Sequence, residues 1–333
     1  MPGKDLVPGR NPDYVMIAHE FFHTWNIMRI HSADYTGVSY KPVQLSGLWV
    51  SEGFTVYFAD LLVRRAGLHT PSPTRLAYLK DLIAWYLSNP DNALYPAEEN
   101  SRGAFKPPTG DAHPDRYVLW EQSELMAALL DFNIRAATDG ERSLDDLMRA
   151  LYADFPGPRG FTTADIERLA TRVSGHNLKP FFAACVRRAG KLEVARYLAM
   201  VGLQMEMKTI KAAAPDGTLM PDTRIYGLLP TGESKLCLYL THPQSAWLFA
   251  GIRNGDQLLS VNGSGVETEA EFNDLLNTLH VGDQVKLEVI RAGKQHQINV
   301  NLASYDWPDV TLRPSPAANQ RQQRILAQWQ ASK

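Results

Sequence analysis

The stretch HEFFH, residues 19–23, decides how the first part of the chain is interpreted. It lies in an apolar-periodic run that follows Asn11 and Pro12, a residue suited to cap a helix and one suited to its first turn. The pattern predicts a helix from there to about Ile30. Because residues four apart share one face of a helix, both histidines of the stretch can reach the same ion.

Two imidazoles at this spacing indicate a zinc site. Zinc suits two neutral histidines and a carboxylate, with one position left for water. We therefore expect His19 and His23 to hold one Zn²⁺ per chain. Glu20 follows the first ligand directly and is expected to act as the general base that takes a proton from that water.

The third metal ligand is expected to be Glu52. It stands in LWVSEGF, residues 48–54, at the start of a second predicted helix that Ser51 is suited to cap and that runs to about Arg65. A carboxylate among apolar residues needs a partner. The alternative is that Glu52 only favours the helix N-terminus electrostatically. Asp60, two turns further along, either orients a histidine or is a solvated or structural residue.

The periodicity changes near residue 200. Residues 1–195 are mostly helical in pattern, and Ser143 and Thr162 open helices with an aspartate three residues later. Residues 196–305 carry short strand-like periods, including a hairpin at residues 285–302 and a helix that Thr268 caps. Residues 306–333 form a polar tail with a short helix. We predict a multidomain α+β protein.

Several segments resemble one known family. The motifs HEFFHTWN at residues 19–26 and LWVSEGFT at 48–55 are similar to those of M61 peptidases, the glycyl aminopeptidase family of gluzincins. RAGL at residues 65–68 and ERSLDDLMRAL at 141–151 extend the resemblance. The segment WLFAGIRNGDQLLSVNG, residues 247–263, resembles the core of a PDZ domain.

The resemblance implies a helical gluzincin catalytic domain over residues 1–195 and a PDZ-like β-barrel or sandwich over 196–305. It implies a single zinc, hydrolysis of peptide bonds and a preference for small N-terminal residues such as glycine or alanine. The Tyr226–Leu229 segment would be the loop that binds a peptide's terminal carboxylate, by strand addition at a sheet edge. The alternative is a PDZ fold that only packs against the catalytic part.

Two departures from the family bear on activity. Family members usually carry a large β-rich region before the zinc helix, which is absent from this chain, so the sequence is expected to be an N-terminally truncated fragment. The family's oxyanion-stabilising tyrosine aligns with Trp120. Tyr117, one turn earlier, is the substitute candidate for that catalytic role, with a packed core tyrosine as the alternative. Losing one oxyanion donor costs about 10²–10³ in rate.

Composition excludes several other functions. The 333 residues carry a net charge of −2 without a strongly basic stretch, which argues against nucleic acid as the partner. No apolar run approaches the roughly 18 residues of a membrane span, and no signal peptide is visible. A soluble protein is expected, in the cytoplasm or the periplasm. The cysteines Cys185 and Cys237 fit neither a metal site nor a disulfide framework.

The sequence therefore predicts a zinc-dependent peptidase, most simply an aminopeptidase acting on a peptide or protein substrate. The alternative is a weak or inactive peptidase homologue that works as a PDZ-type peptide-binding module. The intact HEFFH stretch and Glu52 favour the first interpretation. The missing upstream region and Trp120 favour the second.

Overall fold

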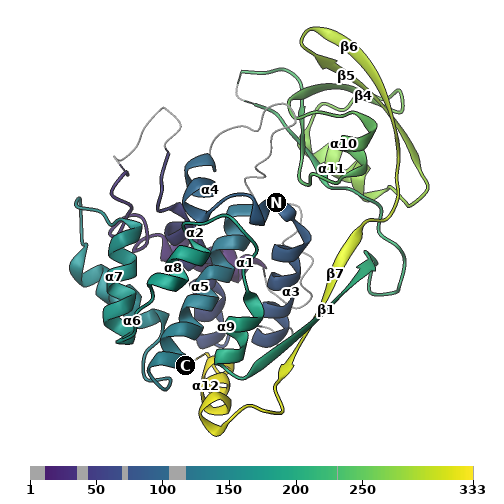
Figure 1. The fold of residues 1–333 in the computed structure, drawn as a ribbon. Helices are drawn as coiled ribbons and strands as arrows, with labels where there is room; N and C mark the ends of the chain where they lie inside the picture. Colours follow the sequence, from purple (N-terminus) through teal and green to yellow (C-terminus); the bar gives the residue numbers. More distant parts are fainter. Residues whose placement is uncertain (1–11, 36–43, 70–73, 105–117, 231, 333) are drawn as a thin grey trace.

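The computed structural model describes residues 12–35, 44–69, 74–104, 118–230 and 232–332, which form a helical part, a sheet-containing part and a ribbon between them (Figure 1). The helices of the first part are α1 (Pro12–Phe22), α2 (Leu48–Arg65), α3 (Arg75–Ser88), the 3₁₀ turn η2 (Pro90–Ala93), α4 (Ala97–Gly103), α5 (Val118–Ala137), α6 (Leu144–Asp154), α7 (Thr163–Ser174), α8 (Lys179–Cys185) and α9 (Val194–Met200).

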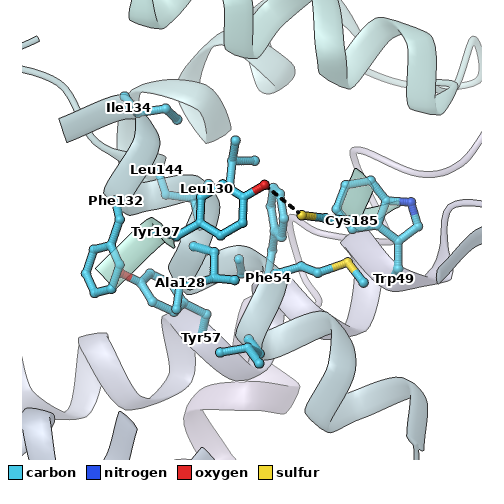
Figure 2. Close-up of a cluster of buried hydrophobic side chains, with 14 of the residues drawn as sticks. Trp49, Phe54, Tyr57, Ala128, Leu130, Phe132, Ile134, Leu144, Cys185 and Tyr197 are labelled. Carbon is cyan, nitrogen blue, oxygen red and sulfur yellow. Dashed lines mark hydrogen bonds between the residues drawn. The ribbon is translucent and has the colours of Figure 1, made fainter. Parts of the chain in front are cut away.

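Helices α2 and α5 form the centre of the helical part, since each is buried around most of its circumference. Figure 2 shows side chains of both helices in one buried cluster, in which the Cys185 thiol is hydrogen-bonded to the Tyr197 hydroxyl. Gly53 allows the close approach. A Cβ at this position would lie 2.3 Å from the Cβ of Ser123 and 2.5 Å from its carbonyl carbon. Any other residue would push α5 away from the turn that carries Glu52.

Helix α1 ends at Phe22, so the prediction that it runs to about Ile30 is wrong. The physical reason lies in Asn26, which is fully buried. Its side-chain amide donates to the carbonyl oxygens of Val50 and Ser51, at 3.0 and 3.1 Å, and to the hydroxyl of Thr55 at 3.0 Å. These bonds hold the chain after α1 against the first turns of α2.

Helix α2 begins at Leu48 with Gly47 at the N-cap position, so the cap lies four residues before the predicted one at Ser51. The backbone of Ser51 is already within the helix and donates to the Gly47 carbonyl oxygen. Glu52 therefore lies on the second turn of α2, inside the helix and next to the core.

A buried polar network ties the end of the chain to the helical core. The Tyr57 hydroxyl donates to Asp131 at 2.6 Å and accepts from Arg75 at 2.6 Å and from the Trp329 indole at 3.2 Å. Asp131 also pairs with Arg135 at 2.8 Å. Because Trp329 belongs to α12 (Gln320–Gln330), the tail helix packs onto the same core as α2 and α5.

The second part contains a five-stranded antiparallel sheet in the order β2-β3-β4-β5-β6, so β2 and β6 are its edges. The strands are β2 (Ile225–Leu228), β3 (Cys237–Leu240), β4 (Asp256–Val261), β5 (Gln284–Arg291) and β6 (Lys294–Asn301), with helices α10 (Ala246–Ala250) and α11 (Glu269–Asn277). The predicted hairpin is confirmed as β5 and β6, and the predicted capping boxes at Ser143, Thr162 and Thr268 are confirmed. The sheet has its own apolar core.

A two-stranded ribbon connects the two parts. Strand β1 (Leu203–Lys211) pairs antiparallel with β7 (Asp306–Pro314). The segment that precedes the sheet in the chain therefore lies beside the segment that follows it (Figure 1). The parts also touch directly, because His242 Nε2 donates to the Ser88 carbonyl oxygen at 2.8 Å. The division at residues 195/196 and 305/306 remains a prediction.

Candidate metal centre

Three side chains, from α1, the turn after it and α2, converge on one point. His19 lies on α1 and His23 directly follows its last residue, and their Nε2 atoms are 2.9 Å apart. The Oε2 atom of Glu52, on α2, is 3.4 Å from the Nε2 of His19 and 3.7 Å from that of His23. Among the described residues, His19, His23 and Glu52 form a group whose ligand atoms lie close enough together to hold one metal ion. His19 is buried, and the other two are half-buried.

The donor set fits a tetrahedral zinc. An ion with ligand distances of about 2.0–2.2 Å places its donor atoms about 3.3–3.6 Å apart. The three observed separations, 2.9, 3.4 and 3.7 Å, bracket that range. Two nitrogens and one carboxylate oxygen are also the donors that zinc takes in hydrolytic sites.

The ring of His23 is oriented by its own turn. Its Nδ1 atom lies 3.0 Å from the carbonyl oxygen of Asn26, which can only accept. The Nδ1 proton is therefore donated there, and in the neutral ring Nε2 carries a lone pair toward the centre. Since Asn26 is itself bonded to α2, one residue both orients the histidine and holds the two helices together.

Glu52 is held as an anion. Burial raises the pKa of its carboxyl, but the His19 hydrogen bond, electrostatic interaction with both imidazoles and the Trp120 indole outweigh burial, so this pKa lies below its ordinary value. The Trp120 Nε1–H donates to Oε2 at 3.0 Å. A charged, pre-oriented carboxylate is the form in which a metal ligand is needed.

Trp120 is the residue whose contribution the sequence does not predict. The sequence aligns Trp120 with an oxyanion donor, whereas its indole hydrogen-bonds the carboxylate of Glu52 across the α2–α5 contact. Only the indole N–H, a donor without an acceptor in local sequence, points to this role.

The other predicted residues are placed differently. Glu20 follows His19 on α1 and is exposed, beside the exposed Phe21. Asp60 accepts from Arg64 at 2.9 Å, which favours the structural alternative for this carboxylate. Tyr117, the substitute oxyanion donor, lies outside the described residues. Both cysteines are buried and free, and burial raises the pKa of Cys185 to about 11, so this thiol stays protonated.

Comparison with known proteins identifies both parts of the chain. Residues 13–122 match the family model of M61 glycyl aminopeptidases, and residues 240–302 match that of PDZ domains. The chain carries an M61 peptidase domain followed by a PDZ domain. The M61 match includes all three converging residues and Trp120, and the family resemblance and fold class predicted from the sequence are confirmed.

A solved structure supports the fold of nearly the whole chain. The aminopeptidase N family protein from Idiomarina loihiensis aligns with a TM-score of 0.59 over 92% of this chain, at 18% identity. The alignment covers 54% of that protein, so this chain spans about half its length. At this identity the likeness concerns the fold alone.

Two curated relatives match a short segment of the chain. Both are described as probable periplasmic serine endoprotease DegP-like, from Pseudomonas putida strains W619 and F1. They are 31% and 32% identical over 70 and 62 residues, which is 21% and 19% of this chain and 15% and 13% of theirs. This chain therefore spans a small fraction of either relative. Within the described ranges, no helix is long and apolar enough to cross a membrane.

Proposed function

We propose that the M61 domain is a zinc-dependent peptidase, an aminopeptidase that prefers small N-terminal residues. The observation that carries the proposal is the convergence of His19, His23 and Glu52 with zinc-like spacing. When bound, zinc would act as a Lewis acid that polarises a peptide carbonyl and lowers the pKa of a water molecule.

The protein's own residues would orient the reaction and move its proton. The Glu20 carboxylate takes the proton from the attacking water and passes it to the amine that leaves as the peptide bond breaks. Its exposed position beside buried His19 suits this role, since a general base must reach the substrate side of the centre. Asn26 holds the His23 ring, and Trp120 holds the Glu52 carboxylate, through the bonds described above.

The alternative is a weak or inactive peptidase homologue whose PDZ domain binds peptides. Trp120 favours it, because its indole N–H is directed at Glu52 and so is turned away from a substrate oxyanion. Zinc content and hydrolysis of glycyl- and alanyl-amide fluorogenic substrates separate the two. Bound zinc with turnover that a chelator removes supports the peptidase. Bound zinc without turnover supports the alternative, and the absence of zinc after the ion is supplied contradicts the proposed centre.

Replacing Trp120 with phenylalanine is expected to weaken zinc binding by about 10-fold. The change removes the N–H donor to Glu52 while it keeps an aromatic ring, and losing an outer partner of a metal ligand costs about 10–100-fold in affinity. Competition with a zinc chelator measures the effect. Trp85→Phe is the matched control, because Trp85 lies on α3 and packs against Trp307. Equal zinc affinity in the two variants would show that the indole bond does not position Glu52.

A further inference from the structure

Strand β2 forms one open edge of the sheet in the PDZ domain. Within the sheet, β2 is the first strand and pairs with β3 on its inner side. The register pairs Ile225 with Leu240, and the Thr241 amide donates to the Arg224 carbonyl oxygen at 3.2 Å. Because N–H and C=O groups alternate along an antiparallel strand, Gly227 and Leu229 direct their backbone groups away from β3, toward the open edge.

Helix α11 lies close beside this edge. A Cβ at Gly227 would come within 3.2 Å of the Phe272 ring, so the glycine lets strand and helix approach. Phe272 is fully buried, and Leu276, one turn further, is nearly so. The open edge of β2 and the exposed side of α11 therefore lie side by side.

One side chain of α11 already bonds to the open edge of β2. Glu269, the first residue of α11, is exposed, and its carboxylate accepts from the backbone N–H of Leu229 at 3.0 Å. This is the N–H that an added peptide strand would need for its own carbonyl oxygen. In the free protein, the Glu269 carboxylate thus accepts the hydrogen bond that a bound peptide would accept from Leu229.

The surroundings of Glu269 are acidic. Glu267, Glu271 and Asp274 all lie on or just before α11 and are exposed. Glu271 is committed to the capping box, where it accepts from the backbone of Glu267 and Thr268. When a peptide displaces Glu269 from the Leu229 N–H, the freed Glu269 carboxylate faces the peptide, and the neighbouring acidic side chains add to its negative charge. A cationic peptide side chain compensates that charge, and an acidic one is repelled.

We propose that Glu269 closes the β2 edge in the free protein and selects extended peptides with a lysine or arginine opposite Leu229. The proposal rests on the peptide-binding role proposed for the PDZ domain. It adds to that role a competing internal group and a charge preference.

The test uses the whole chain and fluorescein-labelled hexapeptides with free carboxyl termini. There are four sets of peptides, one for each of the last four positions. Each set contains three pools, with lysine, glutamine or glutamate fixed at that position and mixed alanine, valine and leucine elsewhere. Fluorescence polarisation gives the affinities. At one of these positions we expect the lysine pool to bind about three- to fivefold tighter than the glutamate pool, the upper part of the range for an exposed charge pair.

Three variants decide the outcome. Glu269→Gln is expected to remove the lysine preference, Glu269→Lys to reverse it, and Asp274→Asn, a matched change on the same helix, to retain it. An unchanged preference in Glu269→Gln would overturn the proposal while leaving peptide binding in place. No binding of any pool, by wild type or variant, would instead contradict the peptide-binding role itself and the proposal with it. In addition, hydrogen exchange at the Leu229 amide should accelerate in Glu269→Ala, and an unchanged rate would contradict the closure.

Discussion

Replacing Glu20 with glutamine is expected to lower kcat for a glycyl- or alanyl-amide substrate by about 10²–10⁴-fold, the range of general acid–base catalysis. The amide of glutamine cannot accept the proton of the attacking water. Because Glu20 is exposed and lies beside His19 without being one of the three converging groups, zinc content should stay at the wild-type level. Steady-state kinetics and metal analysis on the same preparation check both statements.

The control for this substitution is Glu141→Gln. Glu141 is also an exposed glutamate of the helical part, in the turn between α5 and α6, far along the chain from the HEFFH stretch. It should retain wild-type kcat and KM. If Glu20→Gln kept its activity with zinc bound, another group would have to move the proton. If Glu20→Gln lost its zinc, the lost activity would say nothing about a base, and the assignment of Glu20 outside the metal centre would be wrong.

Replacing Glu52 with alanine is expected to weaken zinc binding by more than about 100-fold, because removing a ligand should exceed the roughly 10–100-fold cost of losing one of its outer partners. Two histidines would remain, as a helical pair without their carboxylate. Competition with a chelator gives the zinc affinity, and activity at a fixed low zinc concentration should disappear with it. His23→Ala should behave in the same way, since all three groups surround one point.

Thermal unfolding gives a second measure that does not depend on catalysis. Zinc that binds only the folded state raises Tm by mass action, so wild type should gain stability as zinc is added. The Glu52→Ala protein should show little or no such gain. A Tm shift equal to that of wild type would mean that the ion binds elsewhere. Unfolding without added metal shows whether the variant is intact, because Glu52 lies beside the tightly packed Gly53–Ser123 contact.

Local sequence patterns predicted much of the architecture. The helical spacing of His19 and His23, the capping boxes at Ser143, Thr162 and Thr268, and the β5–β6 hairpin all depend on residues a few positions apart. The same locality explains the errors at helix ends. The chain leaves α1 at Phe22 because Asn26 bonds to the backbone of α2, a partner 24 and 25 positions away that no local pattern reveals.

The sequence alone indicates the chemical groups of the site: two imidazoles one helical turn apart, a glutamate beside them, and a second carboxylate in an apolar helix. Periodicity is enough for these because helix geometry is the same everywhere in the chain. Tertiary packing brings Glu52 to the histidines, directs the Trp120 indole at Glu52 and places Glu269 beside Leu229. Each of these contacts joins residues from different elements, and their distances depend on how the whole core packs.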